Sequence, residues 1–521
     1  MSHSSSLPGT INGHDASSQT LDWLEVCQSL LDRFLPCTSV NTQPEIEISQ
    51  GLTAPQTLKV FSAVKKAADG ISSQSYSPMT LLDTVIQGDN QNGRGQRLGI
   101  LGEAGSGKTL FLQHFAWELL QRFRDGQGTG LPIWVSPSQL KQITVKDYLL
   151  GPWLEQAAKE NPQVPLAVWR EAFEAGLKAG QFWLLADGMD YLMCDADGAI
   201  GAKGPLSWLK ESLSGLPGLN VMVSCRTETR HNDTKGLAGF ALYQTQNFVY
   251  PQDVEMAIAD CLASARPANG RHGQMPGEDD LALSLGRTLA NPLAEPLRHY
   301  LIAPIRLILC CRFWQDRPGQ FPQTSAGLYR ELTEAFYQWK SELAATTVSQ
   351  REDINRLLGE LGKQMLINQH SDHKPLSQVD VENIFGKQST HLRLALQLEW
   401  LIPRGLVLKG TWERGYGFFD RSFRDYFTAL AIADWRFFLD VYQHHYRIFE
   451  AEWQPVIRFW LGRSDIELQQ KTEFIEALLD FDDRCSPENF YGWRAFQVAA
   501  LALQEVPDCP HGDTIVQKLL K

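Results

Sequence analysis

The sequence predicts an α/β domain with a parallel sheet covered by helices on both faces, followed by a long, mostly helical region. Two observations carry this prediction. Short apolar runs alternate with helical stretches from about residue 97 to residue 250, a pattern typical of parallel strands joined by helices. Beyond Pro251 strand signals nearly vanish, and one small β segment interrupts the helices.

Composition limits the range of functions. The 521 residues are too many for one domain, and 43% hydrophobic against 21% charged residues indicates ordinary globular protein. The net charge of −12 gives no general attraction to nucleic acid or to an anionic membrane. The nine cysteines lack a CxxC pair or metal-ligand spacing, as expected of reduced thiols in a cytoplasmic protein. The longest apolar run, Leu301–Cys311, is too short to span a bilayer and contains Arg306.

The first eighty residues are predicted to hold a flexible tail and short helices. Met1–Thr20 is Ser-rich and polar, without the apolar core of a secretory signal. Apolar residues at helical spacing predict one helix over Leu21–Leu35, and a second is expected around Thr57–Ala68. Gln87–Arg97 has the composition of a loop. The first helix is either an interaction handle or a helix that packs on the next domain.

Residues 81–250 are predicted to form the α/β domain. Its expected helices include Thr109–Arg124 and Val168–Ala179. The expected strands are the runs RLGIL, LPIWVS, QFWLLAD, LNVMVSC and NFVY.

Three further regions follow. Residues 251–345 are predicted to form a helical domain, with helices at Pro251–Ala263, Leu281–Leu289, Ala303–Trp314 and Ser325–Leu343. Residues 346–435 combine helices with the wing-like segment GLVLKGTWERGYGFF, which predicts a winged-helix domain. Residues 436–521 are predicted to be helical.

One motif predicts a nucleotide site. The sequence GEAGSGKT matches GxxxxGK[ST] between a predicted strand and a predicted helix, the context that a P-loop requires. Its glycines let backbone N–H groups face phosphate oxygens, its lysine bridges the β- and γ-phosphates, and its threonine hydroxyl binds Mg²⁺. The predicted binding residues are Gly102, Glu103, Ala104, Gly105, Ser106, Gly107, Lys108 and Thr109. The fold class is therefore a P-loop NTPase domain followed by helical, winged-helix and C-terminal helical segments.

Two later strands supply the other charged groups that such a site needs. QFWLLADGMD places Asp187 at the end of an apolar strand, where it is predicted to hold Mg²⁺ together with Thr109. Asp190 follows in the adjoining loop and is predicted to polarise the attacking water. Arg226 ends the next strand and is predicted to contact the γ-phosphate. With Lys108, these three are the predicted catalytic residues.

Five segments taken in order resemble a NACHT module of the STAND class of signalling NTPases, which includes animal NLR immune receptors and bacterial NLR-like proteins. They are GEAGSGKT, WLLADGMDYL, MVSCRT, the helical pair LIAPIRLILCCRFW and LYRELTEAFYQWK, and FFDRSFRDYF. The resemblance covers about Leu81 to Trp435. It implies adenine nucleotides as ligands.

The resemblance also assigns roles outside the α/β domain. Pro304 occupies the place of a proline that packs against the adenine. Asp420 stands where the family carries a histidine that contacts the ADP phosphate, so either Arg421 takes that part or the closed ADP state is held more weakly. The family's Asp-Glu pair is here Asp190 followed by Tyr191, which puts rapid hydrolysis in doubt. The aromatic residues around Asp420 are expected to be core.

The resemblance implies a signalling switch that is closed with ADP and oligomerises with ATP, with slow hydrolysis. It also implies a protein or ligand trigger, an effector acting in trans, and a part in cytosolic innate immunity of the antiviral, antiphage type. Neither a membrane nor nucleic acid is an expected partner. Three alternatives stay open: an AAA+-like ATPase motor, a nucleotide-binding scaffold with little hydrolysis, and a transcriptional regulator using the winged helix.

Overall fold

The computed structural model describes residues 21–34, 63–67, 70–87, 95–192 (except 129, 141 and 142), 204–263 (except 228, 230–232 and 234), 278–368, 376–408, 411–442, 445–482 and 490–520. Its contacts divide the chain into two compact units. The first unit comprises Met1–Ser264 with Pro403–Arg414, and the second comprises Ala265–Ile402 with Gly415–Lys521. None of the described helices is long and apolar enough to cross a membrane.

The first unit is built on a seven-stranded mixed sheet with the order β2-β1-β7-β3-β6-β5-β4. The pairs from β7 to β4 are parallel, whereas β1 pairs antiparallel with both β2 and β7. The expectation of a wholly parallel sheet is therefore wrong at this edge. The strands are β1 (Ala63–Ala67), β2 (Gly70–Tyr76), β3 (Arg97–Gly102), β4 (Leu131–Val135), β5 (Phe182–Ala186), β6 (Asn220–Arg226) and β7 (Ala241–Thr245).

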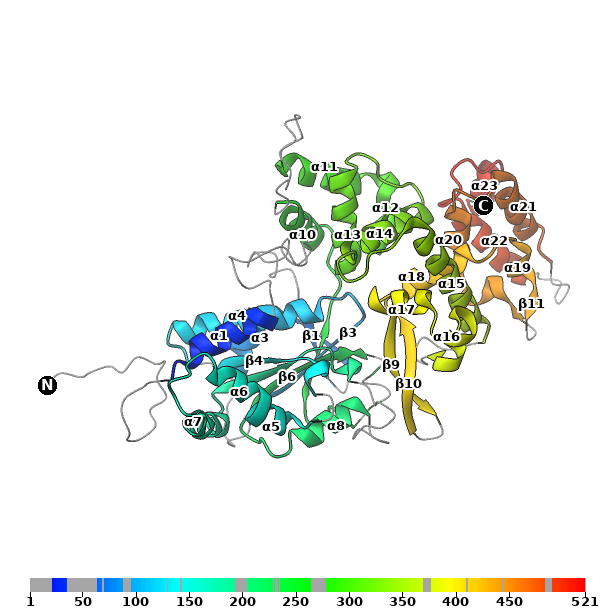
Figure 1. The fold of residues 1–521 in the computed structure, drawn as a ribbon. Coiled ribbons are helices and arrows are strands. Elements are labelled where there is room, and N and C mark those ends of the chain that lie inside the picture. Colours follow the sequence, from blue (N-terminus) through cyan, green and yellow to red (C-terminus); the bar gives the residue numbers. More distant parts are fainter. Residues whose placement is uncertain are drawn as a thin grey trace. The chain divides into compact units, whose positions relative to one another are not determined.

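Helices cover both faces of this sheet (Figure 1). The neighbours Phe182 and Trp183 on β5 point to opposite faces, as successive strand residues do. Trp183 contacts Phe115 of α4, whereas Phe182 contacts Phe173 of α7. Burial on both sides explains why β4, β5 and β6 are continuous apolar runs. The helices here are α3 (Pro78–Gln87), α4 (Lys108–Arg124), α5 (Val145–Tyr148), α6 (Leu154–Ala158), α7 (Leu166–Lys178), α8 (Pro205–Ser212) and α10 (Gln252–Ala263).

The first helix, α1 (Trp23–Phe34), is part of the same core. It packs against β4, the last strand of the sheet, and against α4 and α6. Trp23 is completely buried, with its ring 4.9 Å from that of Trp169 and 5.4 Å from that of Phe182. The packing interpretation of this helix is therefore confirmed. The predicted tail, Met1–Thr20, lies outside the described residues.

Two predicted elements of the first unit are wrong. The helix expected at Thr57–Ala68 is, where described, the strand β1, because residues 63–66 pair with β7. The last strand of the sheet is β7 at Ala241–Thr245, while NFVY after it is irregular. In both cases, pairing with neighbouring strands outweighs local composition.

The second unit is mostly helical, and all four helices predicted for residues 251–345 are confirmed. The first of the four, α10, belongs to the first unit. The other three are α11 (Glu278–Ala290), α13 (Pro304–Asp316) and α14 (Ser325–Trp339) of the second unit, and the additional helix α12 (Glu295–Leu301) lies between α11 and α13 in the sequence. The next elements are α15 (Val348–Ile367), β8 (Leu376–Ser377), α16 (Gln378–Phe385), α17 (Thr390–Gln397), β9 (Leu401–Leu408), β10 (Thr411–Phe418) and α18 (Arg421–Leu430). The three strands form one sheet with the order β8-β10-β9, of which Pro403–Arg414 is counted with the first unit. The winged-helix interpretation of this region stays a prediction.

Aromatic side chains form the core around α18, as the sequence predicted. Phe423 and Phe427 of α18 are buried against Trp400, with ring centroids 5.3 Å and 5.0 Å away. Helix α15 approaches α18 so closely that a Cβ on Gly359 would lie 2.5 Å from the Phe427 carbonyl oxygen. The final elements are α19 (Arg436–Leu439), a short hairpin of β11 (Val441–Tyr442) and β12 (His445–Tyr446), α20 (Gln454–Gly462), α21 (Leu468–Leu479), α22 (Phe490–Ala502) and α23 (Gly512–Leu519).

Candidate functional site

The glycine-rich motif forms the turn between β3 and α4, at the carboxyl end of the central strand. Gly105 and Gly107 have φ values of 67° and 84°, which L side chains rarely adopt. Gly107 is the N-cap of α4, so the loop leads directly into the N-terminus of a 17-residue helix. Because the first N–H groups of a helix lack intrahelical partners, this loop and helix start can bind phosphate.

Lys108 reaches back over this loop. Its Nζ donates hydrogen bonds to the carbonyl oxygens of Gly102 (3.1 Å) and Glu103 (2.7 Å). Burial lowers the pKa of Lys108, and the nearby charge of Arg226 lowers it further. A phosphate group would add a further anion beside this partly buried ammonium, whose pKa Asp190 and Asp187 already raise.

The predicted magnesium ligands, Thr109 and Asp187, are in contact. The Thr109 hydroxyl donates to Asp187 Oδ2 at 2.9 Å, which joins the start of α4 to the end of β5. Burial raises the pKa of Asp187, while the hydrogen bonds from Ser224 and Thr109 lower it by less. A bound cation would compensate the cost of burying this carboxylate in its charged form.

These two oxygen ligands suit a magnesium ion that arrives with nucleotide. Mg²⁺ is usually held by one or two protein oxygens together with substrate phosphates and water. No group of three or more His, Cys, Asp and Glu side chains in the described part of the chain could hold a metal by itself. The donor set therefore fits Mg²⁺ bound with nucleotide phosphates.

Asp190 and Arg226 form an ion pair. Arg226 Nε lies 3.2 Å from Asp190 Oδ2, and the two side chains are only 6% and 8% exposed. Asp190 lies in the short 3₁₀ helix η4 (Met189–Tyr191) after β5, and Arg226 ends β6. The sequence analysis expected both residues at the site, but it paired Asp190 with the attacking water and Arg226 with the γ-phosphate.

Sequence reasoning missed two hydroxyl groups that hold this site together. Ser224 on β6 donates to Asp187 Oδ1 at 2.5 Å and accepts from the Gly188 N–H at 2.7 Å. Thr245, at the end of β7, has its Oγ1 2.7 Å from Ser106 Oγ of the P-loop. A single hydroxyl has no motif of its own, and Thr245 was missed because its strand was misplaced.

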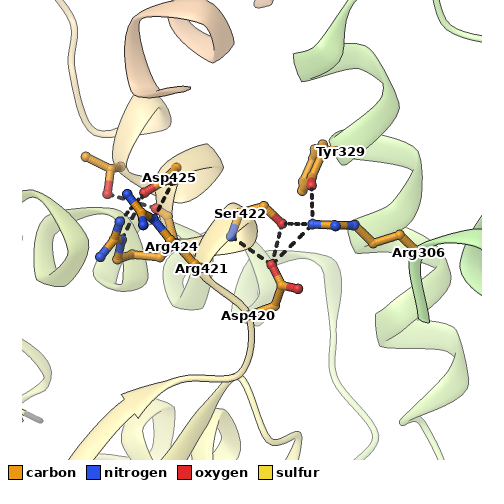
Figure 2. A network of polar contacts seen from close by, with 8 residues as sticks. Arg306, Tyr329, Asp420, Arg421, Ser422, Arg424 and Asp425 are labelled. Carbon is orange, nitrogen blue, oxygen red and sulfur yellow. Dashed lines mark hydrogen bonds and ion pairs between the residues drawn. The ribbon is translucent and has the colours of Figure 1, made fainter. Parts of the chain in front are cut away.

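The remaining predicted residues lie in the second unit. Figure 2 shows two of them, Asp420 and Arg421, with their polar neighbours. Pro304 is the buried first residue of α13, and Arg421, which starts α18, has a half-exposed side chain 3.9 Å from Asp425. Asp420 caps α18 by accepting from the Ser422 N–H at 2.7 Å. It also forms an ion pair with Arg306 of α13 at 3.6 Å. Asp420 thus has an internal partner, and the nucleotide contacts of Pro304 and Arg421 stay predictions.

A family model matches the part of the chain that carries the P-loop, Asp187, Asp190 and Arg226. Residues 96–262 match the family model of the NACHT domain. An uncharacterized WD repeat-containing protein of Nostoc sp. is 30% identical over 135 residues, which cover 26% of this chain and 8% of that protein. The chain thus spans less than a tenth of the length of this curated relative.

Two solved structures are also similar. A structure of the Aeropyrum pernix ORC1 protein in complex with DNA has 15% identity and a TM-score of 0.29, over 68% of this chain and 90% of that chain. A structure of Drosophila ORC bound to DNA has 12% identity and a TM-score of 0.29, over 74% of this chain and 96% of that chain. Similarity at this level does not bear on the function of this chain.

Proposed function

We propose that this chain, whose residues 96–262 form a NACHT domain, is a signalling switch controlled by ATP and ADP that hydrolyses ATP slowly. The contact between Thr109 and Asp187 beside the Lys108 loop carries the proposal, because it brings phosphate-binding and cation-binding groups to one edge of the sheet. In this proposal the ADP form is closed and the ATP form opens and oligomerises.

Each site residue has a proposed role. Lys108 and the loop N–H groups hold the phosphates, and Arg226 contacts the γ-phosphate. Thr109 and Asp187 hold Mg²⁺, which when bound offsets phosphate charge. Pro304 packs against the adenine, and Arg421 approaches a phosphate of the nucleotide.

Slow hydrolysis follows from the surroundings of Asp190. Its Oδ2 is directed at Arg226, and the next residue is Tyr191, so no second carboxylate follows it. A site with few groups able to position an attacking water is suited to holding nucleotide for long periods. The same observation favours a second candidate function, a nucleotide-binding scaffold with very little hydrolysis.

The switch requires a trigger. To change an equilibrium from almost fully closed to almost fully open, a ligand must prefer the open form by about 5 kcal/mol. We propose that an unidentified protein or ligand supplies this preference, that the open chains self-associate, and that an effector in trans gives the output. We place the switch in cytoplasmic defence of the antiphage type, on the resemblance to bacterial NLR-like proteins.

The nucleotide content of the purified full-length chain tests the proposal. We expect wild-type protein, when denatured, to release ADP in a 1:1 ratio and the Lys108→Ala variant to release almost none. Lys210→Ala is the matched control, because this exposed lysine of α8 lies in the same domain. A wild-type chain that carries no nucleotide and turns over ATP rapidly would contradict the switch and favour a motor. Retained ADP without any single-turnover hydrolysis would favour the scaffold.

A further inference from the structure

The Asp190–Arg226 ion pair lies beside the phosphate-binding loop and is fixed from both sides. Arg226 is the last residue of β6 and is in register with Gly102, the last residue of β3. Asp190 follows β5, and the hydrogen bond from the Gly188 N–H to Ser224 ties the start of its loop to β6. The carboxylate and guanidinium groups are therefore held together by three adjacent strands.

The pair belongs to a group of four charges around the phosphate-binding loop. Lys108 Nζ donates to the carbonyl oxygen of Gly102, which is in register with Arg226. Asp187 accepts from Thr109, the residue after Lys108. In keeping with this placement, Arg226 lowers the pKa of Lys108, whereas Asp190 and Asp187 raise it. The group contains two cations and two anions. A phosphate bound at Lys108 adds negative charge next to Arg226, which already has Asp190 as an anionic partner.

Two anions then compete for one guanidinium group. ATP places a γ-phosphate beyond the β-phosphate, and ADP does not. We propose that Asp190 is a positioning residue that holds Arg226 and competes for it with the γ-phosphate, so that this pair sets the preference of the site for ATP over ADP. This inference rests on the nucleotide site of the proposed function.

The competition has a definite sign. Binding the γ-phosphate to Arg226 weakens the ion pair with Asp190, which reduces the affinity for ATP and leaves the affinity for ADP nearly unchanged. Replacing Asp190 by the uncharged, equally sized Asn removes the competitor. Because neighbouring buried charges are strongly coupled, we expect the ratio of ATP affinity to ADP affinity to rise by about tenfold or more.

Three variants of the full-length chain separate this role from others. The affinities for ADP and for the non-hydrolysable β,γ-imido analogue of ATP are measured with Mg²⁺ by titration calorimetry after removal of bound nucleotide. We expect Asp190→Asn to raise the ratio of the two affinities and Arg226→Gln to lower it. The double variant should match Arg226→Gln, because without the guanidinium there is nothing to compete for. Asp125→Asn, at an exposed aspartate after α4, is the control and should not change the ratio.

The affinity ratio is insensitive to partial misfolding, because inactive protein reduces the binding of both nucleotides equally. An unchanged or lowered ratio in Asp190→Asn would overturn the inference. If hydrolysis were lost while the ratio stayed the same, Asp190 would instead be the residue that polarises the attacking water. A wild-type chain that bound neither nucleotide would contradict the proposed function itself, and this outcome is distinguishable from an unchanged affinity ratio.

Discussion

Replacing Asp420 should destabilise the second unit, because Asp420 serves two partners at once (Figure 2). Its Oδ1 accepts from the Ser422 N–H at the start of α18 and lies 3.6 Å from Arg306 Nη1. The Arg306 side chain is only 14% exposed and also donates to Tyr329 Oη (3.2 Å) and Ser422 Oγ (2.6 Å). Asp420→Asn keeps the cap and removes the charge, whereas Asp420→Ala removes both.

The expected magnitudes follow from this geometry. Removing one member of a buried ion pair costs about 3–5 kcal/mol when the other charge is left without compensation. The pair here is long, and Arg306 keeps two hydrogen bonds, so we expect about 2–3 kcal/mol for Asp420→Asn. Asp420→Ala should cost about 1 kcal/mol more, which is the typical value of an N-cap.

Native-state hydrogen exchange measures these losses in the full-length chain, where two units make a single unfolding free energy ill-defined. The opening free energies of amides in α13 and α18 are compared between wild type and the variants. Asp434→Asn, at an exposed aspartate paired with an exposed arginine, is the control and should stay within about 0.5 kcal/mol. If Asp420→Asn also stayed within about 0.5 kcal/mol of wild type, the carboxylate would not be stabilising Arg306.

Three further predictions concern the first unit. Ser224→Ala should weaken Mg²⁺-dependent ATP binding by about tenfold, because a lost hydrogen bond to a charged group costs about 1.5 kcal/mol or more. Titrations should show this loss of affinity with Mg²⁺ and not without it. Ser224→Thr, which keeps the hydroxyl, should restore the affinity. Burial raises the pKa of Asp187 above its ordinary 3.8, so Mg²⁺-dependent affinity should fall as the pH drops through the raised value. The stability contribution has the opposite sign: it is present below 3.8 and lost as the pH rises through the raised pKa. Asp187→Asn should abolish both effects, and pH-dependent binding in that variant would contradict this assignment. Trp23→Ala should destabilise the first unit by about 3–5 kcal/mol, because it removes a fully buried aromatic side chain. Hydrogen exchange of amides in α1 and β4 measures this loss. Exchange equal to that of wild type would show that α1 does not stabilise this core.

The sequence predicts the strands that are buried on both faces. β3, β4, β5 and β6 read as continuous apolar runs because helices cover both sides of each. The P-loop was equally visible, since its glycines, lysine and threonine are fixed in type and spacing by the backbone path and by phosphate chemistry. These two signals locate Lys108, Thr109 and Asp187.

Strands near the edge of the sheet are harder to predict. β1 has the sequence AVKKA, whose alanines and lysines suit a helix, and only its pairing with β2 and β7 makes it a strand. β7 has the sequence ALYQT with only Tyr243 fully buried, so it lacks a continuous apolar run. The predicted strand NFVY nearby is more apolar but pairs with no strand among the residues that the structure describes.

Interactions between side chains are also invisible along the chain. Asp190 and Arg226 are 36 positions apart in sequence, and only the order β3-β6-β5 brings them together. Ser224 likewise contacts Asp187 only because β6 lies next to β5 in the sheet. A sequence pattern can name charged residues at strand ends, but the pairing of strands decides which of them touch.

The strand order also has a consequence for biosynthesis. The β1–β2 hairpin is made before β7, which is its neighbour in the sheet, and Ala63 is opposite Thr245. After Tyr76 completes the hairpin, the ribosome must therefore add about 170 residues before the hairpin can dock, and pairings this distant along the chain form slowly. In a nascent chain, α1 can pack fully once β4, α7 and β5 have emerged, because Trp23 contacts Trp169 and Phe182. Helix α1 and the β1–β2 hairpin thus join the domain at different times. The hairpin is the element that a chaperone would have to shield for longer.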